Sequence, residues 1–463
     1  MKTYQDLLAV GEDDRARMAF VQEVINEHRQ SDAYKIAMDA DAYYRHLNPT
    51  IMRAQKLIYD ALGVAHVDVW TANHKIPSRY FFYFVTQAVQ FLLGNGVSFK
   101  LSEDTKQRFN KSFDSSVQDA ATRAIKGGVA FGYLHRDEGD SDSAGVYSVS
   151  VFDLLDFAPL VDEETSALRA GVRFWQLPSK NRSKPLRAVL YEEDGFTEYV
   201  KRNGEDWAIL EPKQKYIKIM QMSDAGGMQI VDGKNYPGFP IVPLFNINKQ
   251  SDLVGAREVI DAYDLMASAL INNVDDANLI YWVIRNAGGM DETDASRFIR
   301  QLHTSHVAMV EGDEDVDPHT INVPFQASEA ALSCLRTQLF DDFMAFDPKE
   351  IAGGAVTATQ IKAAYEPLNS KTDLFEFQVT EFITGLLKLI EVDDMPSYTR
   401  SMIVNQGEMI ANLVAANGVL PGDYIAKKIV EILGDTDQVE DVLKMITVED
   451  SGRFGNDDDE PEE

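Results

Sequence analysis

Two long stretches of heptad-spaced apolar residues constrain the fold of this chain more than any other feature. The first has seven members at alternating intervals of three and four: Leu253, Ala256, Ile260, Tyr263, Ala267, Leu270 and Val274. The second keeps this spacing with one polar member: Ile361, Tyr365, Leu368, Thr372, Phe375, Val379, Phe382, Leu386 and Leu389. As helices, at about 1.5 Å per residue, they would be roughly 35 Å and roughly 50 Å long. Such apolar seams are typical of helices packed lengthwise, and most belong to an ordinary core.

A compact mixed segment, residues 278–326, follows the first long helix. We expect three strands and one acidic turn there: Leu279–Ile284, His306–Val310, Thr320–Val323 and the turn Glu311–Asp317. A helix over 327–346 and a glycine-containing linker over 347–358 then lead into the second long helix, 359–393. This order of elements suits an elongated subunit whose helices line up beside neighbours in a ring.

The amino-terminal part of the chain has a different pattern. Residues 1–48 are polar and helical in pattern, and the apolar run Tyr80–Leu93 has helix start and stop signals at Pro77 and Gly94. A polar helix is expected over Asp104–Gly127. Between 128 and 244, β-branched and aromatic runs alternate with turn residues, which predicts antiparallel sheet. These runs are Val146–Val151, Arg169–Leu177, Arg187–Tyr191, Thr197–Lys201 and Tyr216–Met222.

The last part of the chain, residues 394–450, predicts a small helical subdomain, and the acidic tail 451–463 is expected to be disordered. The fold class is therefore α+β and predominantly helical. The single cysteine, Cys334, excludes an intramolecular disulfide and is expected to be a small core residue. The amino terminus shows no signal-peptide pattern, and no apolar stretch is long enough to cross a membrane.

The charge of the chain excludes one class of nucleic-acid protein. Lys and Arg number 44 and Asp and Glu 74, so the formal net charge is −30. A protein that reads DNA in a groove needs a basic surface to replace counterions. A protein that must let DNA pass without gripping it remains possible, because negative charge repels phosphates.

Motifs for catalysis and metal binding are absent from the sequence. There is no GxxxxGK[ST] phosphate loop, no HExxH and no cysteine cluster. The glycine-rich stretch Gly127–Gly132 has the wrong spacing for dinucleotides and is expected to be a buried turn. Asp313, Asp315 and Asp317 alternate like the start of a calcium loop, but prolines stand where the glycine and the bidentate glutamate belong. We therefore predict no catalytic residue, no cofactor and no metal site.

Several segments follow one another in a characteristic order along the chain. These are Asn73–Pro77, Phe91–Asn95 and Val97–Phe99; the proline-rich Tyr236–Asn246; Ser251–Leu253, Ile260–Asp264 and Ser268; Thr359–Phe377; and 418–442. They resemble segments of the portal proteins of long-tailed phages. Each piece is short, but their order and spacing together are specific, and they cover roughly residues 50 to 445. The chain departs from the family in a short carboxy-terminal region and in a linker that matches by position rather than by identity.

The resemblance implies a ring of subunits, typically twelve, around a channel at one capsid vertex through which double-stranded DNA is packaged and ejected. It divides the chain into regions: a helical arm 1–48, wing 49–250, stem 251–277 with 327–346, clip 278–326, tunnel loop 347–358, tunnel helix 359–393 and crown 394–450. The implied partners are the terminase, head-completion or adaptor proteins, and the major capsid and scaffold proteins, with no membrane. The implied location is the virion, after assembly in the host cytoplasm.

Two groups of residues are candidates for contact with DNA or partners. The tunnel-loop candidates are Lys349, Glu350, Ile351, Gly353, Gly354, Val356 and Thr357, with Lys349 foremost as a cation and the glycines giving conformational freedom. The clip candidates are Arg285, Arg297, Arg300, His303 and His306. A plain flexible connector is the alternative for the loop, and the clip cations could equally form salt bridges between subunits. A metal-dependent nuclease and a capsid-interior or scaffold protein are the alternative functions.

Overall fold

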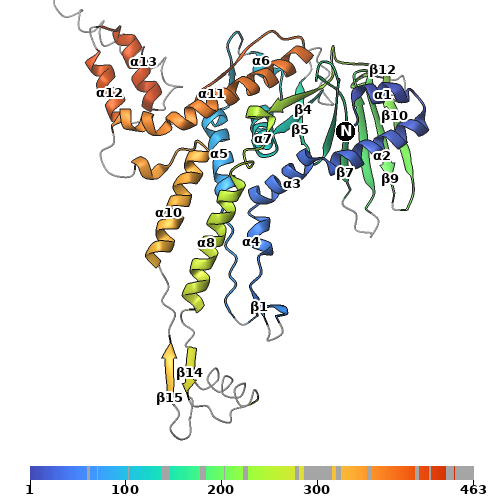
Figure 1. Cartoon of the computed structure of the whole chain (residues 1–463). Helices are drawn as coiled ribbons and strands as arrows, with labels where there is room; N and C mark the ends of the chain where they lie inside the picture. Colours follow the sequence, from blue (N-terminus) through green and yellow to red (C-terminus); the bar gives the residue numbers. More distant parts are fainter. Residues whose placement is uncertain are drawn as a thin grey trace, which may run out of the picture.

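The computed structural model describes residues 1–59, 63–69, 71–102, 104–136, 146–177, 184–202, 204–222, 228–276, 281–285, 293, 315–319, 325–351, 357–401, 406–416, 419–433 and 443. A broad body carries a stem of two helices that descends from it, and two further helices stand above the body at one end (Figure 1). The chain is therefore elongated, with parts that project from the body.

The main core lies where helices pack on a small antiparallel sheet. Its strands, in the order β13-β4-β5, are Ile241–Phe245, Val129–Arg136 and Tyr147–Asp153. The helices α3 (Asp32–Tyr44), α5 (Tyr80–Leu93), α7 (Phe113–Gly127) and α11 (Ala358–Leu389) contribute to this core. All nine seam residues of α11 are buried, as the heptad pattern predicted. The expected helix at Tyr80–Leu93 is also confirmed.

The glycine-rich stretch expected to be a buried turn is the end of a helix followed by a strand. Gly127 is the last residue of α7, and Gly128 caps it in the left-handed conformation with φ 92°. Gly132 lies inside β4, where an added Cβ would meet the ring of Phe382 at 2.5 Å. The glycines are thus explained by a helix cap and by the close approach of α11 to the sheet.

A five-stranded antiparallel sheet forms a second core with the amino-terminal helices. Its order is β10-β9-β8-β7-β6, with strands Trp207–Gln214, Gly195–Lys201, Leu186–Glu192, Leu168–Gln176 and Phe157–Val161. The helices α1 (Tyr4–Val10) and α2 (Asp14–Gln30) bury residues such as Phe20 and Ile25 against it. The strands β11 (Ile217–Met222) and β12 (Met228–Lys234) pair separately. The antiparallel sheet predicted from the β-branched runs is confirmed.

The stem consists of α8 (Arg257–Asp276) and α10 (Phe325–Asp342), which pack side by side (Figure 1). Beyond them, β14 (Tyr281–Arg285) pairs antiparallel with β15 (Asp315–His319). The strand expected at Leu279–Ile284 is thus found, shifted slightly. The acidic turn expected over Glu311–Asp317 is wrong in its second part, because residues from Asp315 belong to β15. The strands expected at His306–Val310 and Thr320–Val323 lie outside the described residues.

The apolar seam of α8 is buried only at its start. Leu253, Ala256 and Ile260 are buried, whereas Val274 is exposed. Cys334 of α10 is also exposed, so its expected place in the core is wrong. Val274 lies near the end of α8 that is far from the body, and Cys334 lies midway along α10. The stem helices there have only each other and a few short segments to pack against.

Shorter elements connect these parts. They are α4 (Pro49–Arg53), the hairpin β1 (Leu57–Tyr59) and β2 (Ala65–Val67), β3 (Val97–Phe99) paired with β16 (Pro396–Tyr398), and α6 (Asp104–Gln107). The polar helix expected over Asp104–Gly127 is therefore two helices, α6 and α7. Above the body, α12 (Gln406–Ala415) packs against α13 (Gly422–Leu433).

Candidate functional site

The segment that leads into the predicted tunnel loop is fixed by aromatic packing. Phe340, Phe343 and Phe346 are all buried. The ring of Phe343 stacks on Phe84 of α5, with centroids 4.4 Å apart. The ring of Phe346 stacks on Tyr365 of α11, with centroids 4.0 Å apart and planes 5° from parallel. Residues 340–346 are therefore part of the core, wedged between α5 and α11, before the loop begins.

Hydrogen bonds hold the same segment at two further points. The amide nitrogen of Gln87 donates to the carbonyl of Phe346 at 2.9 Å, and the amide oxygen accepts its N–H at 3.0 Å. The guanidinium group of Arg336 donates two hydrogen bonds, of 2.6 and 2.7 Å, to the carboxylate of Asp347. The hydrogen bonds from Arg336 lower the pKa of Asp347 below its usual range. The first residue of the predicted loop, Asp347, is thus an anchor.

The next four residues form a single 3₁₀ turn, Pro348–Ile351. Its start is tied back to the anchor, because the N–H of Lys349 donates to the Asp347 carboxylate at 3.0 Å. Lys349 and Glu350 are exposed, while Ile351 packs partly against the core. The turn therefore presents one cation and one anion to solvent from a fixed base.

The other end of the predicted loop is also fixed. Thr357 is the N-cap residue of α11, and its hydroxyl accepts the N–H of Gln360 while the Gln360 side chain accepts the N–H of Thr357. This reciprocal pair is a capping box. Thr357 thus has a structural role at the helix start. Gly353, Gly354 and Val356 lie outside the described residues.

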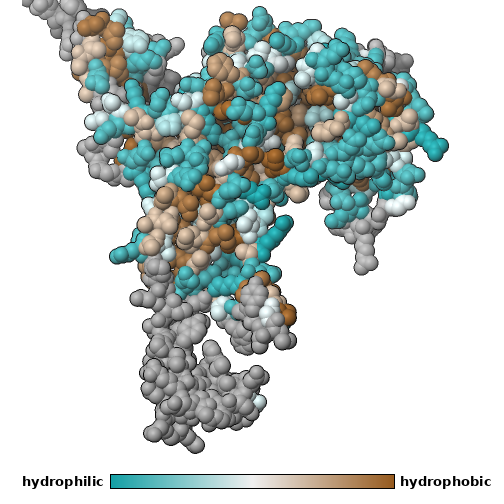
Figure 2. Space-filling view, viewed as in Figure 1, coloured by the Kyte–Doolittle hydropathy of each residue, from teal (hydrophilic) through white to brown (hydrophobic). Residues whose placement is uncertain are grey.

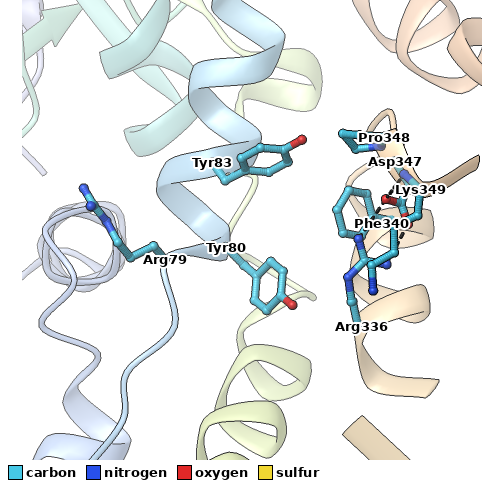
Figure 3. Close-up of a pocket in the computed structure, with 8 residues that line it drawn as sticks. All are labelled: Arg79, Tyr80, Tyr83, Arg336, Phe340, Asp347, Pro348 and Lys349. Carbon is cyan, nitrogen blue, oxygen red and sulfur yellow. Dashed lines mark hydrogen bonds and ion pairs between the residues drawn. The ribbon is translucent and has the colours of Figure 1, made fainter. Parts of the chain in front are cut away.

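A hollow of about 380 Å³ opens beside the anchor. Tyr80 and Tyr83 of α5 face Phe340 and Pro348 across it, and Arg336, Asp347 and Lys349 complete that side (Figure 3). Arg79 extends from the start of α5 away from the other residues (Figure 3). The hollow is aromatic on its walls and charged along the loop, so it links the predicted loop to the body.

Lys371 of α11 links this helix to the ends of α8 and α10 that lie in the body. Its ammonium group pairs with Asp252, just before α8, and donates to the carbonyl of Phe343, just after α10, at 3.1 Å. Asp252 also accepts the side-chain N–H of Asn246 at 2.6 Å. One cation on α11 therefore holds the start of one stem helix and the end of the other.

The predicted clip residues are only partly described. Arg285 ends β14, opposite Asp315 in the register of the hairpin. Arg297, Arg300, His303 and His306 lie outside the described residues.

Two general features hold over the described part of the chain. It contains no helix long and apolar enough to cross a membrane. Its His, Cys, Asp and Glu side chains form no group of three or more that could hold a metal ion.

The sequence analysis missed the anchors that this site depends on. Gln87 binds the backbone of Phe346, which lies 259 residues further along the chain, and no sequence motif indicates this contact. Arg336 binds the carboxylate of Asp347 just beyond the end of α10, and no motif indicates that contact either. The phenylalanines at 340, 343 and 346 repeat every three residues, and that spacing could have indicated a buried helix end.

Comparison with known proteins identifies the family. The model of the family described as phage portal protein, SPP1 Gp6-like, matches residues 22–451. The chain belongs to this family of phage portal proteins. The chain is 24% identical over 422 residues to the portal protein of Bacillus phage SPP1, covering 85% of this chain and 79% of that protein. It is 28% identical over 198 residues to the portal protein of Clostridium phage phiCD119, covering 39% of this chain and 43% of that protein.

A solved structure is also similar to the portal protein. It is a chain of the virion of a native gene transfer agent particle, with a TM-score of 0.43, 13% identity, and coverage of 76% of this chain and 89% of that chain. The family assignment rests on the sequence matches. It confirms the resemblance seen in the sequence, and it makes the portal protein a structural component of the phage capsid that works in an oligomeric assembly.

Proposed function

We propose that the portal protein forms a ring, with twelve copies expected, around a channel at one capsid vertex. The observation that carries this proposal is the continuous path from stem to loop to long helix. The stem helix α10 runs into an anchored segment, 340–347, which presents the exposed turn with Lys349, and α11 starts again from a capped end at Thr357. A short loop that is fixed at both ends can project into a channel and narrow it without closing it.

The negative charge of the chain favours a channel that lets DNA pass, and disfavours one that binds DNA tightly. With a formal net charge of −30, the chain as a whole repels phosphates, which favours a duplex that slides over one that is tightly bound. An exposed lysine repeated once in each subunit then gives weak and non-specific contacts to the backbone. Lys349, Glu350 and Ile351, with Gly353, Gly354, Val356 and Thr357, are proposed to form this constriction.

The projecting parts of the chain suit contacts with other virion proteins. The β14–β15 hairpin ends the stem (Figure 1), which supports the proposal that terminase docks there during packaging and head-completion or adaptor proteins dock there later. Arg285, Arg297, Arg300, His303 and His306 are the proposed contact residues. We also propose contacts with the major capsid and scaffold proteins, assembly in the host cytoplasm, and no catalytic chemistry in the portal protein itself.

A packaging assay tests the proposed function. The portal protein is produced together with the capsid and scaffold proteins of its phage, and the resulting procapsids are incubated with DNA, terminase and ATP. We expect nuclease-protected DNA only in procapsids that contain the portal protein. Equal protection of DNA by procapsids that lack it would contradict the proposal. Metal-dependent cleavage of plasmid DNA by the purified protein would favour the nuclease alternative instead.

A further inference from the structure

The β1–β2 hairpin carries an apolar face that nothing in the described chain covers. Leu57 and Val67 lie directly opposite each other in its register, so they share one face. They are 49% and 48% exposed, and Val69, which follows two residues later, is 77% exposed. Figure 2 shows this as an apolar patch beside the stem. A two-stranded hairpin has no hydrophobic core of its own, so an uncovered apolar face on it needs a partner.

The base of this hairpin is held rigidly. On one side, Tyr43 and Thr50 donate to Asp261 of α8, at 2.5 and 2.7 Å. On the other side, residues 74–78 are hydrogen-bonded to α8 at His74, Ile76 and Ser78. The neck is closed by a bond of 2.9 Å from the N–H of Asp68 to the carbonyl of Lys56. The apolar face is therefore preorganised, which lowers the entropic cost of docking it.

A second uncovered face lies on α10. Its exposed positions Ala327, Ala330, Cys334 and Thr337 alternate at intervals of three and four, and Phe325 at the start of the helix is 52% exposed. The four residues are small and uncharged, in a chain in which 25% of residues are charged, and the row becomes charged only at Asp341, one turn further on. An exposed helix face with few charged residues, and with small residues at heptad spacing, is typical of a surface that another element covers.

In the view of Figure 1, α10 and the β1–β2 hairpin lie on either side of α8. Asp264 and Ser268, which bind the segment that follows the hairpin, are roughly 90° around α8 from the middle of its seam, at about 100° per residue. A contact between two different surfaces of a subunit is heterologous, which is the type of contact that a closed ring of identical subunits uses.

The charges of the two segments are also complementary. Residues 52–79 contain four basic and two acidic side chains, a net charge of +2 in a chain of net charge −30. Residues 325–347, which include α10, contain one basic and four acidic side chains, a net charge of −3. Opposite charge favours the approach of these two surfaces and disfavours the pairing of two copies of either one.

We propose that the hairpin face of Leu57, Val67 and Val69 docks on the exposed face of α10 in the next copy of this chain. The inference rests on the proposed ring and adds the residues that make one of its contacts. The hairpin supplies the bulky apolar side chains, and the small residues of α10 let them approach closely.

Cysteine cross-linking in the assembled portal protein tests this contact. In a Cys334→Ser background, Val67→Cys is combined with Ala327→Cys or with Ala330→Cys; a third variant combines Val67→Cys with the native Cys334. These three registers cover two turns of α10. After assembly is verified by electron microscopy, the rings are oxidised or treated with a short bis-maleimide and run on a denaturing gel.

We expect a ladder of covalent multimers from at least one register. The same variants without Val67→Cys give monomers, and so does the control pair Val161→Cys with Ala327→Cys, because Val161 is exposed on the distant five-stranded sheet. Intact rings without a ladder in any register would overturn the docking proposal while leaving the ring in place. If the unsubstituted protein forms no ring at all, the proposed function fails first.

Discussion

Asn272 holds the backbone of His74 through two hydrogen bonds. Its side-chain oxygen accepts the His74 N–H at 2.6 Å, and its amide nitrogen donates to the His74 carbonyl at 3.3 Å. Ser268 and Asp264 continue this row, accepting the N–H of Ile76 at 3.0 Å and of Ser78 at 2.8 Å. Two extended residues advance about 6.6 Å and four helical residues about 6 Å, so the two segments stay in register. This polar row fastens the body to the stem.

Asp264→Ala should destabilise the protein by about 2–4 kcal/mol, because it leaves the N–H of Ser78 without an acceptor and the buried amide of Asn48 with only the Ser78 carbonyl. Denaturation with guanidinium chloride measures the change in the free energy of unfolding. Asp275→Ala is the control, since its side chain is 57% exposed, and we expect a change of at most about 0.5 kcal/mol. Equal effects of the two substitutions would show that the polar row contributes nothing.

Phe346→Ala should cost about 3–5 kcal/mol, because the ring is buried and stacked on Tyr365. Phe377→Ala is the matched control, because it truncates the same side chain at a position that is 68% exposed. It should change the free energy of unfolding by about 0.5 kcal/mol or less. The comparison is made by thermal and chemical denaturation of the two variants. A small effect at Phe346 would mean that the loop anchor is not part of the core.

The Arg336–Asp347 pair should give a distinct pH dependence. The folded pKa of Asp347 is lowered chiefly by the hydrogen bonds from Arg336, so its stabilisation is present above the unfolded pKa of about 4 and is lost as the pH falls through the folded value. We expect Asp347→Asn to be less stable than the unsubstituted protein by about 1–2 kcal/mol at pH 7.

This difference should shrink as the pH falls from about 4, the unfolded pKa, through the lowered folded pKa of Asp347, where the native carboxylate becomes protonated. Urea denaturation across pH 3 to 7 measures it, with Asp341→Asn on the exposed face of α10 as the control. A difference that stays constant down to the lowest pH would contradict a stabilising role for the Asp347 charge.

Lys349→Ala should weaken the retention of packaged DNA roughly twofold or more, because each subunit loses a cation placed at the loop. Nuclease protection of packaged DNA over time, at several salt concentrations, is the measurement. Lys362→Ala removes an exposed lysine on α11, beyond the loop, and should leave retention unchanged. Normal packaging rate and retention in the Lys349 variant would remove this residue from the mechanism.

The sequence predicts the parts of the fold that depend on local periodicity. The seam of α11 is buried along its whole length, from Ile361 to Leu389, because the helix lies across the sheet and α5 in the main core. In α8 the same kind of seam is buried only near Ile260. Further down, the buried positions are Asp264, Ser268 and Asn272. Their partners lie 186 to 198 residues earlier in the chain, and no periodic pattern signals a pairing over that distance.

The candidate site was predicted in part. The sequence indicates the position of the loop and the exposed cation Lys349, because glycines and a charged turn follow an apolar helix. It does not indicate that Asp347 and Thr357 are structural residues, since their roles depend on Arg336 and on the start of α11. Polar residues in a linker look alike until their partners are placed by tertiary packing.

Electron microscopy of the purified portal protein in negative stain, with mass photometry alongside, tests the central claim most directly. We predict rings with a central hole and a mass of roughly twelve copies of the 51.8 kDa chain. A compact, closed dimer or tetramer without a channel would contradict the account.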